Sequence, residues 1–285
     1  MKKVIDYLSA ELKIDDKALL EKDILLHRLL QELLQDSFFQ ENFVFKGGTC
    51  LTKCYLGYYR FSEDLDFSWK NQHLFSAKSQ KEIRKILSMK ITALIELLQQ
   101  AALKLHLNFK PDKSDKRYIE LGGSNKFSTF KLWYVSEISG AEQFIKVQFN
   151  FFELFLYPFQ ECSANSIIQG INEKELTFLF PEEAVSLLNT PKVACYSLLE
   201  ILVEKFRAIL TRKSTKARDF VDVFVITRKN KINPATIRAE IIRKTKFMLR
   251  YDKYVQNLNE FNLKTMVRGE EQKLLLRPLE SGFEL

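Results

Sequence analysis

The pattern that most constrains this chain is a pair of glycines followed shortly by two aspartates that are separated by one residue. Gly47 and Gly48 come after a short apolar run, and Asp64 and Asp66 open the next apolar run. If that second run is a β-strand, side chains alternate between its two faces, so both aspartates lie on one face. The pattern therefore predicts a strand, a glycine turn, a helix and a strand that carries two carboxylates.

The aspartate pair predicts a site for a divalent cation. Two carboxylates held this close repel each other, and Mg²⁺ takes oxygen ligands from one or two carboxylates and from substrate phosphates. We therefore expect Asp64 and Asp66 to bind Mg²⁺ and to be catalytic. The alternative is that the pair caps a turn or lies on a solvated strand edge, which Asp-x-Asp sequences often do.

The diglycine predicts a phosphate-binding turn. Glycine allows a tight turn and a close approach of the backbone to a ligand. The helix expected from Thr49 onward would offer its N–H groups and positive dipole end to an anion. Thr49 is placed to cap that helix or to donate its hydroxyl to the phosphate.

The order of these motifs resembles the nucleotidyltransferase superfamily with its polymerase-β-like fold. More narrowly, the chain resembles the AbiEii/AbiGii toxin family, the toxin half of bacterial abortive-infection toxin–antitoxin pairs. The residues that carry the resemblance are Gly-Gly-Thr-x-Leu-x-Lys at 47–53, Arg-Phe-Ser-x-Asp-Leu-Asp-Phe at 60–67, Glu-Lys-Phe-x-Ala at 204–208, Arg212, and Ala-Arg-Asp-Phe-Val-Asp at 217–222.

The resemblance implies Mg²⁺-dependent transfer of a nucleoside monophosphate from an NTP to an RNA hydroxyl. The expected acceptor is the 3′ end of tRNA, the expected outcome is a block of translation in phage defence, and a cognate antitoxin is implied. Lys205 is expected to hold the triphosphate and Asp219 to complete the catalytic site, with Asp222 as an alternative. The expected nucleotide-binding residues are Gly47, Gly48, Thr49, Lys53, Arg60, Ser62 and Arg212.

The chain departs from the family pattern on the strand predicted around residues 144–150. Where a third metal-binding carboxylate is usual, this strand carries Lys146, Gln148 and Asn150, and Glu153 follows it. Gln148 or Asn150 could serve as a neutral oxygen ligand, the third acid could come from elsewhere, or Asp64 and Asp66 could act alone. Lys146 could instead contact phosphate.

This departure leaves two rival functions open. The protein could bind nucleotide or RNA without chemistry, or it could transfer a nucleotide to a small molecule. A formal charge of +8 and an isoelectric point near 9.1 favour an anionic partner such as RNA. The basic helical C-terminus argues mildly against a small acceptor.

The periodicity predicts an α+β protein with a small mixed β-sheet flanked by helices and a mainly helical C-terminal half. We expect a nucleotidyltransferase-like domain over residues 1–180 and a helical domain over residues 181–285 that completes the active site. Helices are expected over 15–36, 79–105 and 192–212, and strands over 107–110, 117–121, 127–135 and 144–152.

The remaining composition predicts a cytoplasmic protein with reduced cysteines. The N-terminus lacks the apolar core of a secretory signal, and we expect no apolar run long enough to span a bilayer. Cys50 and Cys54 lie four apart on a predicted helix, and we find no Cys or His pair elsewhere that completes a zinc set. We expect buried thiols.

Overall fold

The computed structural model describes residues 1–213 and 216–260, which form two compact units. Unit 1 comprises Met1–Glu153 and Glu161–Cys195, and unit 2 comprises Leu154–Gln160 and the chain from Tyr196 onward. This division lies further along the chain than the predicted boundary at residue 181. The reason is that residues 192–195 form a strand of the sheet in unit 1.

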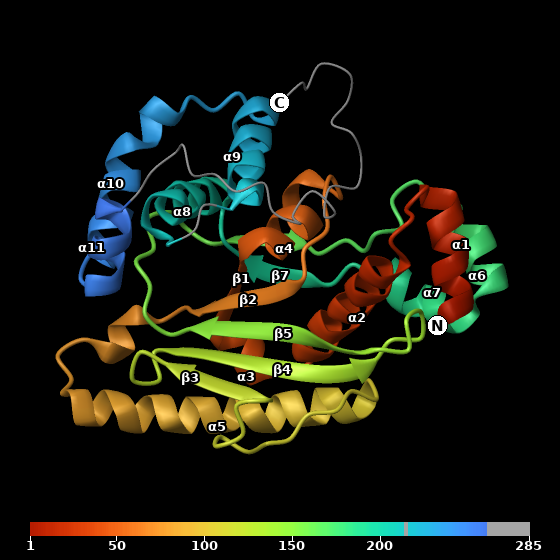
Figure 1. Ribbon diagram of the computed structural model, residues 1–285, viewed down its shortest axis with the longest axis horizontal. Helices are drawn as coiled ribbons and strands as arrows, with labels where there is room; N and C mark the ends of the chain where they lie inside the picture. Colours follow the sequence, from red (N-terminus) through yellow and green to blue (C-terminus); the bar gives the residue numbers. More distant parts are fainter. Residues whose placement is uncertain (214–215, 261–285) are drawn as a thin grey trace. The chain divides into compact units, whose positions relative to one another are not determined.

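Unit 1 is built on a mixed sheet, which has seven strands in the described part of the chain (Figure 1). Its order is β3-β4-β5-β2-β1-β7-β6. β2 pairs in parallel with β5 and β1 in parallel with β7, whereas β1–β2, β3–β4 and β4–β5 are antiparallel. The strands are β1 (Phe43–Lys46), β2 (Asp64–Trp69), β3 (Ile119–Gly122), β4 (Phe127–Val135), β5 (Glu142–Asn150), β6 (Gln160–Ser163) and β7 (Lys192–Cys195).

Side-chain capping sets the starts of the two long helices of unit 1. Asp16 accepts a hydrogen bond of 3.1 Å from the amide of Leu19, and Ser79 and Glu82 form a reciprocal capping box. The helical elements of unit 1 are α1 (Lys2–Leu12), α2 (Lys17–Leu33), α3 (Ser37–Asn42), α4 (Gly47–Leu51), the π-helical turn η1 (Thr52–Leu56), the 3₁₀ turn η2 (Gln72–Phe75), α5 (Gln80–Lys104), α6 (Glu173–Leu179) and α7 (Pro181–Leu188). The predicted α+β class is confirmed.

The two faces of the central strands differ because apolar and polar residues alternate along them. One face carries an aromatic cluster in which the Phe67 ring lies 5.2 Å from that of Phe45 and 5.5 Å from that of Phe149. Phe39 of α3 packs edge-on against Phe67 at 4.9 Å. The alternate residues of the same strands, Asp64 and Asp66 among them, therefore lie on the opposite face.

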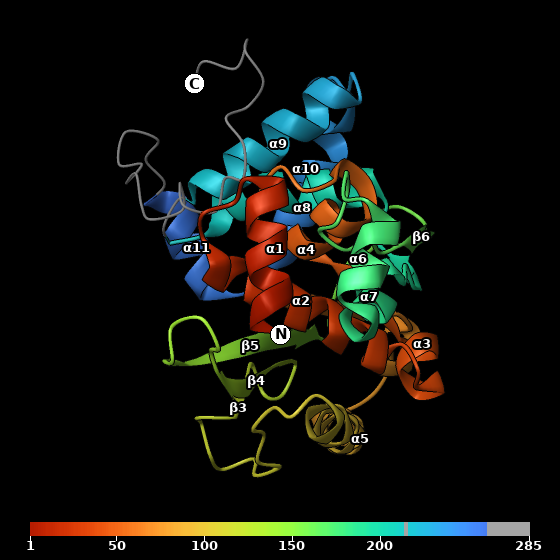
Figure 2. The ribbon, with the colours of Figure 1, turned by 90° about the vertical axis from the view of Figure 1, so that its right-hand side faces the viewer.

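Helix α5 runs along the β3–β4 end of the sheet, as both ribbon views show (Figures 1 and 2). Its buried stripe includes Leu87, Leu94 and Leu98. In the described part of the chain, α5 alone has the length and hydropathy of a membrane-spanning helix, which differs from the expectation of no such run. The core helices of soluble proteins meet the same criteria, and part of α5 is buried in the fold.

The helices of unit 2 pack around α8. In Figure 1 these helices run in colour from blue-green to blue. Helix α8 begins at Leu198, where Ser197 caps it, rather than at the predicted residue 192. The basic side chain of Lys244 is buried in this unit, 2.6 Å from the Glu200 carboxylate. The elements are α8 (Leu198–Thr211), α9 (Ala217–Lys229), the 3₁₀ turn η3 (Pro234–Ile237), α10 (Arg238–Met248) and α11 (Asp252–Asn259).

Candidate functional site

Strand β2 places Asp64 and Asp66 at the start of the strand on one face, as predicted. In the parallel pairing with β5, Asp64 lies opposite Lys146 and Asp66 lies opposite Gln148. On the other side, Asp66 pairs with Lys46 of β1. The Lys146 ammonium lies 2.8 Å from Asp64 Oδ2, so one carboxylate of the pair already has a cationic partner.

The glycine turn lies directly against the second carboxylate. Gly47 has φ +81°, a conformation that favours glycine, and a Cβ built on it would lie 2.4 Å from Asp66 Oδ2. A Cβ on Gly48 would lie 2.4 Å from the Arg60 guanidinium. Gly47 is therefore favoured by its backbone conformation and by space, whereas a side chain at Gly48 would force the Arg60 guanidinium to shift. The turn, Asp66 and Arg60 form one compact group.

Thr49 links this turn to strand β2. Its hydroxyl contacts the Ser62 hydroxyl at 2.7 Å and donates to the carbonyl of Asp64. Helix α4 has no side-chain cap, so the capping role considered for Thr49 is not the one it plays. Through these contacts, the buried Thr49 hydroxyl holds the glycine turn and strand β2 together.

Lys53 is placed differently from the predicted phosphate contact. Its ammonium lies 3.1 Å from Asp23 Oδ1 and 2.5 Å from the Tyr58 hydroxyl, and its side chain is 0% exposed. Arg60 is also buried, and it donates to the carbonyl of Phe61 at 2.8 Å. Lys53 therefore neutralises a buried carboxylate.

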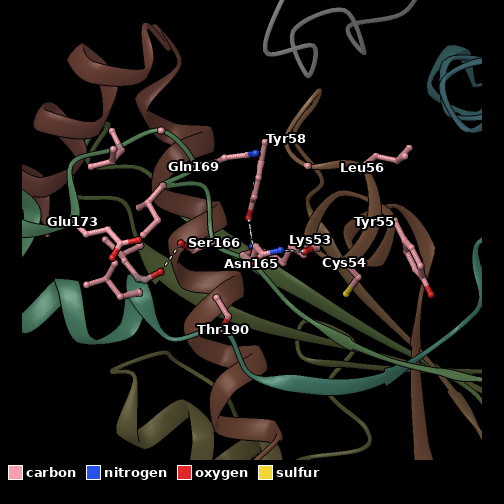
Figure 3. Close-up of a pocket in the computed structure, with 16 residues that line it drawn as sticks. Lys53, Cys54, Tyr55, Leu56, Tyr58, Asn165, Ser166, Gln169, Glu173 and Thr190 are labelled. Atoms are coloured by element: carbon pink, nitrogen blue, oxygen red, sulfur yellow. Dashed lines mark hydrogen bonds between the residues drawn. The ribbon is translucent and has the colours of Figure 1, made fainter. Parts of the chain in front are cut away.

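A cavity of about 530 Å³ adjoins Lys53, with Tyr58 and Asn165 beside it (Figure 3). The Tyr58 hydroxyl contacts Asp23 at 2.9 Å, and its distance to the carbonyl of Asn165 is 3.3 Å. The cavity is not predictable from the sequence, because it is lined by residues from 53–58 and from 165–190, which are far apart in the chain.

The strand beside β2 carries amides where a third carboxylate was looked for. Gln148 lies directly opposite Asp66, and its Nε2 donates to Thr129 Oγ1 at 3.2 Å. Asn150 instead donates at 3.0 Å to Glu153, a buried carboxylate that also pairs with Lys46 at 3.2 Å. Glu153 thus contacts Asn150 and Lys46, and the residue opposite Asp66 is Gln148.

The predicted residues of the C-terminal motifs gather within unit 2. The Lys205 ammonium lies 2.8 Å from Asp219 Oδ1 and 2.6 Å from Asp222 Oδ2, and Arg212 also pairs with Asp219. Burial alone would raise the pKa of Asp219, but the charges of Lys205 and Arg212 hold that pKa below its usual range. The predicted site residues thus form two groups, one in each unit.

The residues of unit 1 fit a Mg²⁺ ion. Asp64 and Asp66 offer two carboxylates on one face, and the missing Cβ of Gly47 lets the glycine backbone lie against Asp66 Oδ2. Mg²⁺ commonly uses one or two carboxylates and completes its shell with water and phosphate oxygens. Asp64 and Asp66 would hold the ion, with Gln148 opposite Asp66 as a neutral neighbour.

Comparison with known proteins gives one family. The model of a family described as "Nucleotidyl transferase AbiEii toxin, Type IV TA system" matches residues 28–279. Among solved structures, the chain is similar to the crystal structure of JHP933 from Helicobacter pylori, with 16% identity and a TM-score of 0.45 over 92% of this chain and 89% of that chain. No curated protein gives a match.

Proposed function

Because this chain belongs to the AbiEii nucleotidyl transferase toxin family of type IV toxin–antitoxin systems, we propose that it transfers a nucleoside monophosphate from an NTP to RNA. The single observation that carries the proposal is the contact between the Gly47 turn and the Asp66 carboxylate. That contact joins a turn suited to phosphate to a carboxylate pair suited to Mg²⁺.

In this proposal, the residues of the chain act by position and charge. Asp64 and Asp66 would hold Mg²⁺, which when bound would neutralise charge on the phosphates. Gly47 and Gly48 let the backbone approach the triphosphate closely, and Thr49 and Ser62 line the same turn. The acceptor hydroxyl forms the new bond to the α-phosphorus as the bond to pyrophosphate breaks.

The roles of Lys205, Arg212 and Asp219 also belong to the proposal. The family resemblance assigns Lys205 and Arg212 to the triphosphate and Asp219 to the completing acid. The ion pairs of Lys205 with Asp219 and Asp222 bring these residues together within unit 2, and the assignment to the triphosphate rests on the resemblance. Lys205→Ala should reduce transfer, while substitution of an exposed lysine, Lys192→Ala, should not.

The proposed acceptor is the 3′ end of tRNA, and the proposed consequence is a block of translation during abortive infection. The positive charge of the chain supports an anionic acceptor. A cognate antitoxin is implied by the family, and a cytoplasmic location follows from the proposed substrates.

The test is incubation of the protein with Mg²⁺, total bacterial tRNA and each α-labelled NTP in turn. Label in tRNA that disappears with EDTA supports the proposal and names the nucleotide. Label in an aminoglycoside but not in RNA would instead favour the small-molecule function. The same incubations with tRNA fragments that lack the 3′ end identify the acceptor site.

A second function is favoured by Gln148 and Lys146. The Gln148 amide lies opposite Asp66, and the Lys146 ammonium pairs with Asp64. This face of the sheet therefore offers a metal ion fewer anionic ligands than a site with three carboxylates would. The protein would then bind nucleotide or RNA without transfer. RNA binding that persists in EDTA, with no NTP consumed, would support this function.

A further inference from the structure

All four cysteines of the chain come together in unit 1. The Sγ atoms of Cys50, Cys54 and Cys195 all lie within 4.8 Å of one another. The Cys162 Sγ lies 2.8 Å from the Cys195 Sγ, and all four thiols are free. The sequence alone indicated no Cys or His pair that would complete a zinc set with Cys50 and Cys54, whereas the fold brings Cys195 beside them.

The fold explains why these residues meet. Cys50 and Cys54 are four residues apart across α4 and η1, so their side chains lie on one side of the helical segment. Cys195 ends β7, which pairs with β1 so that Cys195 lies opposite Phe45. Cys162 belongs to β6, the next strand in the sheet.

From this geometry, we propose that the four cysteines form a structural zinc site. Tetrahedral Zn²⁺ with Zn–S bonds of about 2.3 Å places its sulfurs about 3.8 Å apart. The spacing of Cys50, Cys54 and Cys195 is compatible with that arrangement. Cys162 lies against Cys195 but outside this close group, so its side chain would have to turn toward Cys50 and Cys54 to supply the fourth sulfur. Sulfur ligands select zinc over Mg²⁺, so this site is chemically distinct from the aspartate pair.

The surroundings of the cluster suit a closed metal site with a path for entry. Cys50 and Cys195 are fully buried, whereas Cys54 is partly exposed and lines the cavity of about 530 Å³ (Figure 3). The Tyr55 hydroxyl lies 3.3 Å from Cys195 Sγ and can donate to its thiolate. Such outer hydrogen bonds orient metal ligands and balance their charge.

The ion would join the segment after the glycine turn to strands β6 and β7. Four short elements, α4, η1, β6 and β7, would then be held by one set of bonds. Metal bonds of this kind contribute directly to folding stability. Removal of zinc should therefore lower the thermal stability of the protein and leave Asp64 and Asp66 in place on β2.

The test is the zinc content of the full chain, purified from zinc-supplemented cells and dialysed against metal-free buffer. We expect equimolar zinc in the wild type and at least a tenfold loss in Cys50→Ser and Cys195→Ser. Cys162→Ser should weaken zinc binding against a competing chelator, and unchanged binding would exclude Cys162 as a ligand. Asp66→Asn is the matched control, because it removes an oxygen ligand and should retain full zinc.

A second measurement does not depend on the folding of the variants. Wild-type protein stripped of metal is titrated with Co²⁺, which should give thiolate-to-cobalt charge transfer and the visible bands of tetrahedral Co²⁺. Absence of these bands together with less than a tenth of an equivalent of zinc would overturn the proposal. A Cys162–Cys195 disulfide in the freshly purified, metal-free protein would overturn it as well.

Discussion

The α-carbon of Gly47 faces the Asp66 carboxylate so closely that a methyl group there would lie 2.4 Å from Oδ2. The glycine is the first residue of α4, and the aspartate lies on β2, which pairs antiparallel with β1. The Asp66 carboxylate can therefore keep its position only if residue 47 is glycine.

Gly47→Ala should abolish nucleotide transfer, because the new Cβ displaces the Asp66 carboxylate. The variant also places alanine at φ +81°, which costs about 1–2 kcal/mol of stability. Gly140→Ala is the matched control, since Gly140 has φ +68° and no atom within 4 Å of the built Cβ. Equal activity losses in the two variants would show that strain, rather than the Asp66 contact, is responsible.

Lys146→Met should increase the affinity of the aspartate pair for Mg²⁺. The Lys146 ammonium lies 2.8 Å from Asp64 Oδ2 and competes with the ion for that carboxylate. The measurement is the Mg²⁺ concentration that gives half of the thermal stabilisation of the protein. Lys131→Met is the control, because Lys131 lies opposite Lys146 in the sheet but pairs with Glu120. Weaker Mg²⁺ binding in Lys146→Met would contradict the account.

Asp23→Ala should lower the free energy of unfolding by about 3–5 kcal/mol, because it leaves the buried Lys53 ammonium without its carboxylate. Adding Lys53→Met should recover much of that loss, and urea unfolding measures both. The exposed Lys104–Glu32 pair provides the control, since Glu32→Ala should cost about 0–1 kcal/mol. A loss in Asp23→Ala no larger than in Glu32→Ala would contradict the buried pair.

The protein should lose stability as the pH falls below the ordinary pKa of histidine, and His27 is the reason. Burial lowers the pKa of His27 to about 3 in the folded protein, so only the unfolded chain binds the proton at mildly acidic pH. The stabilising effect is complete above pH 6.5 and is lost progressively down to about pH 3.

The measurement compares urea unfolding of the wild type and His27→Gln between pH 7 and pH 5. The wild type should lose about 2 kcal/mol more than the variant over this range. His73→Gln, which removes an exposed imidazole, should follow the wild type. Parallel curves for the wild type and His27→Gln would contradict the prediction.

The aspartate site was predictable from sequence because its determinants are local. Alternation along β2 alone places Asp64 and Asp66 on one face, and the strand predicted over residues 127–135 matches β4. The helix around residues 79–105 was also marked by its apolar spacing and by Ser79 at its start.

Other features depend on partners far away in the chain. The apolar residues of 192–195 continue the spacing of the following helix, but pairing with β1 makes them a strand. Likewise, Lys53 pairs with Asp23 only in the folded chain. Cys50 and Cys54 also lie near Cys195 only after folding. No local pattern distinguishes a buried lysine from one that is available to phosphate.

The most direct test of the central claim is transfer of α-label from NTP to tRNA by the wild type and by Asp64→Asn and Asp66→Asn, with release of pyrophosphate measured in parallel. Asp115→Asn, which removes a carboxylate from a loop outside the site, is the control. We expect equal amounts of label and pyrophosphate in the wild type and the control, and neither product in the two site variants. Transfer that survives in Asp66→Asn, or its absence in a wild type that still binds NTP and tRNA, would contradict it.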